Sequence, residues 1–188
     1  MKRMILASGS PRRKELLQML EVPFEVLVSD TKEVITKNEP AEVTKELSYQ
    51  KAMAVAEQVE EGIIIGADTV VSIDGKILGK PADTEEAREM IYKLQGKSHM
   101  VYTGVTVIAK SGDMVSASSF ADGTKVNVAP MTENEIEAYI STDEPYDKAG
   151  AYGIQGLFGK FIEGIKGDYF NVVGLPVHRL YEELKKFD

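Results

Sequence analysis

Two long segments with alternating apolar and polar residues, 99–109 and 114–129, constrain the fold of this chain more than any other pattern. Their period of two predicts two long β-strands, and the intervening Ser-Gly-Asp is typical of a tight turn. Other strand patterns alternate along the chain with amphipathic helical segments, the clearest of which runs from Asp83 to Gly96. The sequence therefore predicts an α/β or α+β fold, a mixed, twisted sheet with flanking helices.

The composition is that of an acidic globular protein. Its 188 residues, 43% of them apolar, are enough for one sizeable core, so a single domain is expected over residues 1–188. A formal net charge of −8 argues against nucleic acid or a membrane surface as the partner, because both need a broad basic field. The absence of cysteine rules out disulfides and thiolate chemistry, and two distant histidines, His99 and His178, make a histidine-rich zinc site unexpected.

No apolar run approaches the ~20 residues of a membrane-spanning helix. The apolar run near the N-terminus is too short for the core of a signal peptide. A cytoplasmic location is therefore expected.

The first functional candidate is a strand–turn–helix unit close to the N-terminus. Residues 3–8 predict a buried strand, Ser10 suits a helix N-cap and Pro11 suits the first helical position. Arg12 and Arg13 then fall where the helix dipole is already positive, which costs ~0.3–1 kcal/mol each unless an anion compensates them. Two solvated arginines are the simpler alternative, but the misplaced charge favours a phosphate site. The unit is not a Walker A loop, whose motif is absent.

Three further charged residues fall at informative places. Residues 62–68 predict a buried strand that ends at Asp68, where α/β sheets usually bind ligands, although an aspartate that merely forms a turn fits too. Lys80 follows a predicted hairpin with an Asp-Gly turn, and a surface lysine is the alternative there. Lys51 shares the apolar row of a helix predicted over 41–59, so it either extends to solvent or points into a site.

The C-terminal third contains a long glycine-rich segment. Residues 142–158 predict a loop, and the three glycines of DKAGAYGIQG, residues 147–156, suggest close approach of the backbone to a ligand. Loops of this length without secondary structure are uncommon and often functional. Residues 159–170 resemble a hairpin, and residues 23–29 earlier in the chain predict a second strand.

These candidates combine cations with carboxylates. Together they form the set that metal-assisted phosphoryl chemistry uses, in which acids hold the metal and cations neutralise phosphate. Spacing alone does not bring the segments together. The cations are Arg12, Arg13, Lys51 and Lys80, and the acids are Glu33 and Asp68.

Five motifs occur in one order over nearly the whole chain: SGSPRR, GADT, GKP, DKAGAYGIQG and GLP. With them the chain resembles the Maf family of nucleotide pyrophosphatases, which is related in fold to the inosine triphosphatase-like enzymes. The resemblance implies an elongated α/β fold with two lobes around a central cleft. It also implies hydrolysis of nucleoside triphosphates to the monophosphate and pyrophosphate with Mg²⁺ or Mn²⁺, and a homodimer as the family-level expectation.

The resemblance also implies residue roles. Ser8, Arg12 and Arg13 would line the triphosphate site. Glu33, Lys51, Asp68 and Lys80 would form the catalytic charged cleft, with Glu33 and Asp68 as metal ligands and Asp68 as general base.

Substrate choice within the family depends on a few positions. Arg13, Thr69 and Gln155 match the branch that prefers dTTP and UTP, so these and modified pyrimidine triphosphates are the expected substrates. A glutamine amide can accept from N3–H of uracil or thymine and donate to O4, which suits Gln155. Two alternatives stay open: a 7-methyl-GTP pyrophosphatase, and a nucleotide-binding regulator of cell division that senses without turnover.

Overall fold

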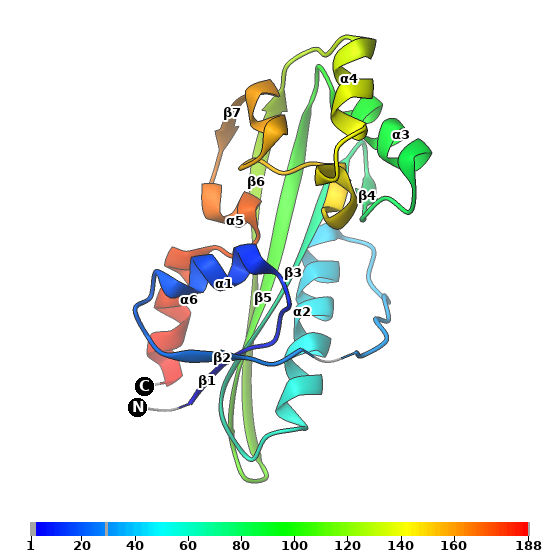
Figure 1. The fold of residues 1–188 in the computed structure, drawn as a ribbon. Helices are drawn as coiled ribbons and strands as arrows, with labels where there is room; N and C mark the ends of the chain where they lie inside the picture. Colours follow the sequence, from blue (N-terminus) through cyan, green and yellow to red (C-terminus); the bar gives the residue numbers. More distant parts are fainter. Residues whose placement is uncertain (1–2, 29, 188) are drawn as a thin grey trace. The chain divides into compact units, whose positions relative to one another are not determined.

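A computed structural model describes residues 3–28 and 30–187. Within these residues seven strands form one mixed sheet in the order β2-β1-β3-β5-β6-β7, with β4 paired to β3 (Figure 1). β1 is parallel to both β2 and β3, whereas β4 and β7 run antiparallel to β3 and β6. The strands are β1 (Met4–Leu6), β2 (Phe24–Val26), β3 (Glu61–Ile73), β4 (Lys76–Leu78), β5 (Ser98–Ser111), β6 (Met114–Val128) and β7 (Ile162–Lys166).

The expected mixed sheet with flanking helices is confirmed. The helices are α1 (Pro11–Gln18), α2 (Pro40–Ala56), α3 (Thr84–Leu94), α4 (Glu133–Ile140), α5 (Tyr169–Val173) and α6 (Val177–Leu184), with shorter 3₁₀ turns between them. Among the described residues, no helix has the length and apolarity needed to cross a bilayer. The cytoplasmic location and the homodimer stay predictions.

The chain separates into two compact units. Unit 1 comprises residues 1–68, 103–122 and 174–188, and unit 2 comprises residues 69–102 and 123–173. Three long strands, β3, β5 and β6, contribute residues to both units. The single domain over residues 1–188 and the central cleft both stay predictions.

In unit 1, α2 lies on one face of the sheet, with α1 and α6 on the other (Figure 1). Neighbouring side chains of β6 point to opposite faces of the sheet. Ser119 Oγ forms a 2.8 Å hydrogen bond with Thr106 Oγ1 on the face covered by α2, whereas Ser118 donates to Glu183 of α6. Thr106 continues this chain to Ser48 of α2 at 2.8 Å. An apolar cluster joins β1, β3 and β5 to α2: Ile5, Ala7, Ile64 and Ile108 from the strands and the residue after β1 pack with Ala52, Val55 and Ala56 of α2.

In unit 2, α3 and α4 cover a second apolar core. The predicted stripe of α3 is buried. Thr132 and Glu135 form a capping box at the start of α4. Arg88 of α3 forms a two-pronged ion pair with Glu137 of α4, at 2.6 and 2.9 Å, which holds the two helices side by side.

Several predicted boundaries are wrong. The hairpin predicted over 159–170 does not form, because residues 162–166 pair with β6 as β7 and residues 169–173 then form α5. The loop predicted over 142–158 contains short 3₁₀ helices at Glu144–Asp147 and Ala149–Ala151, so it is not without structure. The strand predicted over 23–29 is shorter, and its last residue lies outside the described residues.

His99 gives unit 2 a pH-dependent stability. Its Nε2 lies 2.6 Å from the Tyr152 hydroxyl, and burial lowers the pKa of His99 to about 4. In the unfolded chain this histidine binds a proton near pH 6.5. The contribution of neutral, buried His99 to the free energy of unfolding is therefore fully present above that pH and is lost as the pH falls towards 4. We expect a loss of about 2 kcal/mol between about pH 7.5 and about pH 5, measured by urea unfolding. His99→Gln should remove this loss, whereas His178→Gln, at an exposed position, should retain it.

Candidate functional site

Arg13 is anchored within unit 1 and is not a solvated surface arginine. Its Nε donates to the Gly174 carbonyl at 2.9 Å, and its Nη1 donates to Ser8 Oγ at 3.2 Å. Burial lowers the pKa of the Arg13 guanidinium, and the nearby Asp68 carboxylate opposes that shift. Arg12 is partly buried on the same turn of α1. The predicted strand–turn–helix unit therefore presents the Arg13 guanidinium in a fixed position.

Ser8 and Gly174 position this turn. Ser8 is buried, and its hydroxyl accepts from the backbone N–H of Ser10 at 3.3 Å as well as from Arg13. Ser10 is the N-cap residue as expected, but its side chain makes no capping bond. Sequence reasoning assigned no role to Gly174, although it begins the GLP motif that carried part of the resemblance.

Three of the predicted residues meet at one point of unit 1. Lys51 Nζ lies 3.0 Å from the Glu33 carboxylate and also forms an ion pair with Asp68. The exposed fractions of the side chains are 26% for Lys51, 12% for Asp68 and 48% for Glu33. Lys51 thus points into a charged cluster rather than out to solvent, which resolves the alternative left open by the sequence.

The strand that carries Asp68 differs from the prediction. β3 does not end at Asp68 but continues to Ile73, because its last residues pair with β4 in the predicted Asp-Gly hairpin. The parallel register between β1 and β3 nevertheless stops at Leu6 and Ile65. Asp68 therefore follows the carboxyl end of the parallel pairing, which is where ligands bind in such sheets.

Gly66 brings α2 close enough for the ion pair to form. Gly66 and Asp68 share one face of β3, since side chains alternate along a strand. A Cβ on Gly66 would overlap the Ser48 carbonyl oxygen and lie 2.9 Å from Ala52 Cβ, and these two residues flank Lys51 on α2. The missing side chain therefore permits the contact between helix and strand that places Lys51 against Asp68. The sequence indicates this contact only through the glycine of the GADT motif, to which the sequence analysis assigned no steric role.

The carboxylates of this cluster suit a hard divalent cation. Glu33 and Asp68 contact the same ammonium group, so their oxygens already converge on one positive charge. Mg²⁺ typically takes one or two protein carboxylates and completes its shell with water and substrate phosphate. Within residues 3–28 and 30–187, no group of three or more acidic, histidine or cysteine side chains could hold a metal by itself. The donor set thus fits an ion that is shared with a phosphate ligand.

In unit 2 the structure joins two of the sequence motifs. The Gly150 N–H donates to the Gly79 carbonyl at 2.9 Å, which ties the glycine-rich segment to the residue preceding the exposed Lys80. Gly150 has a φ of 71°, and a Cβ there would lie 2.8 Å from Val71 Cγ2. The positive φ and the lack of space for a side chain both explain why this residue is glycine. The close contact with Val71 packs the glycine-rich segment on β3, two residues beyond Thr69.

Gln155 is exposed and lies between two glycines that contact side chains of their own segment. A Cβ on Gly153 would be 2.7 Å from Lys148 Cε, and one on Gly156 would be 2.6 Å from Glu144 Oε1. Protein contacts therefore account for these glycines, without the approach of a ligand that the sequence suggested.

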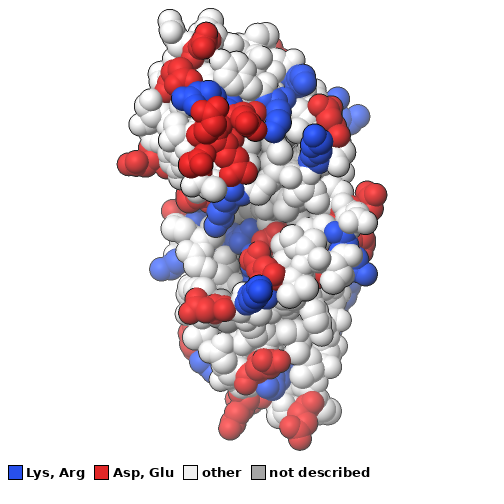
Figure 2. Space-filling model, turned by 90° about the vertical axis from the view of Figure 1, so that its right-hand side faces the viewer, with Lys and Arg blue, Asp and Glu red and all other residues white. Residues whose placement is uncertain are grey.

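Charged side chains of both signs are interspersed over the face shown in Figure 2, with acidic groups gathered in its upper part. That face carries no broad basic field.

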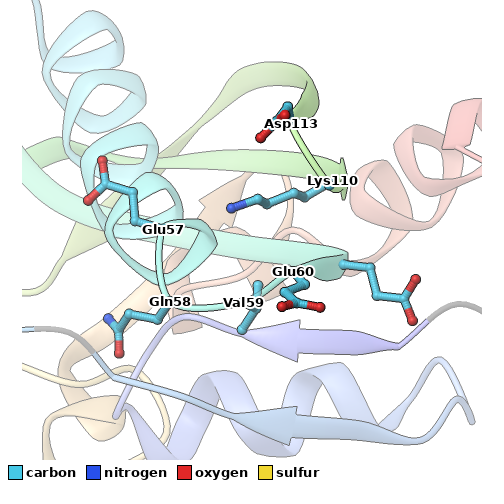
Figure 3. A pocket seen from close by; sticks show the side chains of 8 residues that line it. Glu57, Gln58, Val59, Glu60, Lys110 and Asp113 are labelled. Atoms are coloured by element: carbon cyan, nitrogen blue, oxygen red, sulfur yellow. The ribbon is translucent and has the colours of Figure 1, made fainter.

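A hollow of about 510 Å³ lies elsewhere in unit 1. It is lined by Glu57, Gln58, Val59, Glu60, Glu61, Lys110, Gly112 and Asp113, none of which is a predicted site residue (Figure 3). Lys110 Nζ donates to the Ala56 carbonyl at 2.7 Å, where it complements the C-terminal end of α2. Glu61 precedes Asp68 on β3 by seven residues, roughly 20 Å along a strand. The hollow is thus separate from the charged cluster.

The fold and the cluster define an α/β protein in which cations and carboxylates meet beyond the carboxyl end of a parallel strand pair, and comparison with solved structures agrees with the fold. A Ham1 protein of Staphylococcus aureus shares the fold, with a TM-score of 0.55 and 13% identity over 100% of both chains. The family model described as Maf-like protein matches residues 3–187, and the chain belongs to the Maf family.

Curated relatives in two Bacillus species carry a specific name. The dTTP/UTP pyrophosphatase of Bacillus cytotoxicus is 53% identical, and the protein of the same name from Bacillus cereus is 50% identical. Each alignment covers 100% of this chain and 97% of the relative.

Proposed function

We propose that this protein hydrolyses dTTP and UTP, and modified pyrimidine triphosphates, to the monophosphate and pyrophosphate. The observation that carries the proposal is the convergence of Asp68 and Glu33 on Lys51, in the unit that also holds the anchored Arg13. The names of the relatives supply the nucleotides and the products.

In the proposed reaction a water oxygen attacks the α-phosphorus. The new P–O bond forms as the bond from the α-phosphorus to the bridging oxygen breaks, and pyrophosphate leaves with that electron pair. Asp68 accepts a proton from the attacking water. Lys51 and Lys80 neutralise negative charge in the catalytic site, while Ser8, Arg12 and Arg13 hold the triphosphate. Mg²⁺ or Mn²⁺ held by Glu33 and Asp68 would supply further charge neutralisation and a more acidic water.

Gln155, Thr69 and Arg13 are proposed to select the base. The Gln155 amide can accept from N3–H and donate to O4 of uracil or thymine. A base that leaves such groups unpaired is rejected by ~10⁴-fold at best, whereas the C5 methyl group is worth only ~1–3 kcal/mol. The enzyme should therefore accept both dTTP and UTP.

The test is pyrophosphate release over a panel of standard, modified and 7-methylated triphosphates, with Mg²⁺, with Mn²⁺ and with a chelator. The proposal expects release from dTTP and UTP that the chelator abolishes. Clear preference for 7-methyl-GTP would overturn the choice of base. Tight binding of triphosphates without any release would identify a sensor instead of an enzyme.

The two arginines of α1 are expected to differ in their effects. Arg12→Ala should lower kcat/KM for every nucleotide by a similar factor, about 10–100-fold, as expected for a lost charge-assisted contact. Arg13→Ala should also change the ranking among nucleotides. Steady-state kinetics over the panel measure both effects, and Lys14→Ala, an exposed neighbour on the same helix, is the control. Equal losses on all substrates for both variants would show that this division of roles is wrong.

A further inference from the structure

Glu144 is a half-buried carboxylate with three hydrogen-bond donors in unit 2. Its Oε2 accepts from the Leu157 N–H at 2.7 Å, and its Oε1 accepts from the Phe158 N–H at 3.3 Å and from the Tyr139 hydroxyl at 3.0 Å. Burial raises the pKa of Tyr139, and the charge of Glu144 adds to that shift. Glu144 thus closes a loop of the chain onto itself, from the 3₁₀ turn at Glu144–Asp147 to the start of the 3₁₀ turn at Leu157–Phe161.

The residues between these ends are held from both sides. Lys148 Nζ donates to the Glu144 carbonyl at 2.8 Å, and the Lys148 side chain fills the space beside Gly153. The Glu144 carboxylate fills the space beside Gly156. The short segment that carries Gln155 is therefore supported at both ends by side chains of its own loop, and the support after Gln155 is Glu144.

We propose that Glu144 is a positioning residue that sets nucleotide preference by fixing the backbone from which Gln155 extends. This inference rests on the proposed function, in which Gln155 selects the base. Hydrogen-bond recognition depends on the donor and acceptor being held within about 0.5 Å of their working positions. A carboxylate that binds the two N–H groups following Gly156 provides that constraint, and it does so without touching the base.

The decisive variant is Glu144→Gln, which has the same shape but turns an NH₂ group towards a backbone N–H. One N–H then loses its acceptor, and we expect the preference for UTP over CTP, as a ratio of kcat/KM, to fall about tenfold. The change should appear mainly in KM, with kcat for the better substrate altered no more than about threefold. Glu137→Gln, which breaks the ion pair to Arg88 in the same unit, is the matched control and should leave the ratio unchanged.

A double-mutant cycle distinguishes positioning from a general loss of structure. If Glu144 acts through Gln155, then adding Glu144→Gln to Gln155→Ala should not change the ratio further. An equal change in both backgrounds, or an unchanged ratio in the single variant, would overturn the inference. If Glu144→Gln does not fold, Gly156→Ala provides the second route, because its Cβ would displace the carboxylate and should lower the same ratio.

Failure of this inference differs from failure of the proposed function. Wild-type protein that releases no pyrophosphate from any triphosphate would reject the proposed function, and the inference with it. Wild-type protein that prefers UTP, with a Glu144→Gln variant that keeps the same preference, would reject the inference alone.

Discussion

Replacing Asp68 with asparagine is expected to lower the turnover of dTTP and UTP by about 10²–10⁴-fold, the usual contribution of a general base. Asparagine has nearly the same shape but cannot accept the proton of the attacking water, and it no longer forms the ion pair with Lys51. Pyrophosphate release at saturating nucleotide measures the loss. Binding of a non-hydrolysable triphosphate should change only a few-fold, because Arg12, Arg13 and Ser8 remain.

Asp74→Asn is the matched control for this substitution. Asp74 lies in the turn between β3 and β4, is exposed, and has a φ of 50°, a conformation that asparagine also tolerates. Its turnover should equal that of the wild type. Glu33→Gln should lose less than Asp68→Asn, because Glu33 is about half exposed and its charge is better screened. An Asp68→Asn variant with full turnover would remove Asp68 from the mechanism.

Gly66→Ala is expected to cost about 3 kcal/mol of stability, the upper part of the range for overpacking a filled core. The new Cβ would meet the Ser48 carbonyl oxygen and Ala52 of α2, and a backbone contact cannot be relieved by rotating a side chain. The helix must therefore move away from β3. Urea unfolding measures the loss, and the folded fraction should also turn over more slowly, because Lys51 moves with the helix.

Two other glycines separate the causes of this effect. Gly164→Ala, in β7, meets no atom within 4 Å and should leave stability nearly unchanged. Gly104→Ala would meet Thr44 at the beginning of α2, where its Cβ would also lie 2.6 Å from the Lys45 nitrogen, so a comparable loss of stability is expected. Turnover per folded molecule should nevertheless fall less, because Thr44 is seven residues from Lys51. Equal turnover losses in the Gly66 and Gly104 variants would contradict the steric role given to Gly66.

Local patterns predicted those elements whose causes are local. The helix predicted to start at Asp83 does so because its N-cap bond is local: the Asp83 carboxylate accepts from the Glu86 N–H, three residues further on. The alternating pattern predicted β5 and β6 correctly because both strands are long and the turn that joins them contains typical turn residues. The apolar stripe predicted α3 correctly because one face of this helix supplies most of its contacts to the core.

The predictions that were wrong concern pairing between distant segments. The end of β3 is decided by β4, which extends the strand past Asp68, and no residue near Asp68 signals this. The pairing of β7 with β6 joins residues about forty positions apart, and no local pattern indicates it. The sequence therefore predicted a hairpin within residues 159–170 instead. Glu144 was passed over because its donors, Leu157 and Phe158, are apolar residues that act through their backbone.

The residues alone specify the types of chemical group that are present: the cations, the acids, the glycine-rich segment and the order of the five motifs. They do not specify which charges meet. Lys51 reaches Asp68 because a helix can approach a strand at Gly66, and Arg13 is held because the chain returns to it at Gly174. Charge is a property of each side chain, whereas the distances that turn charges into a site depend on packing between segments that are far apart in sequence.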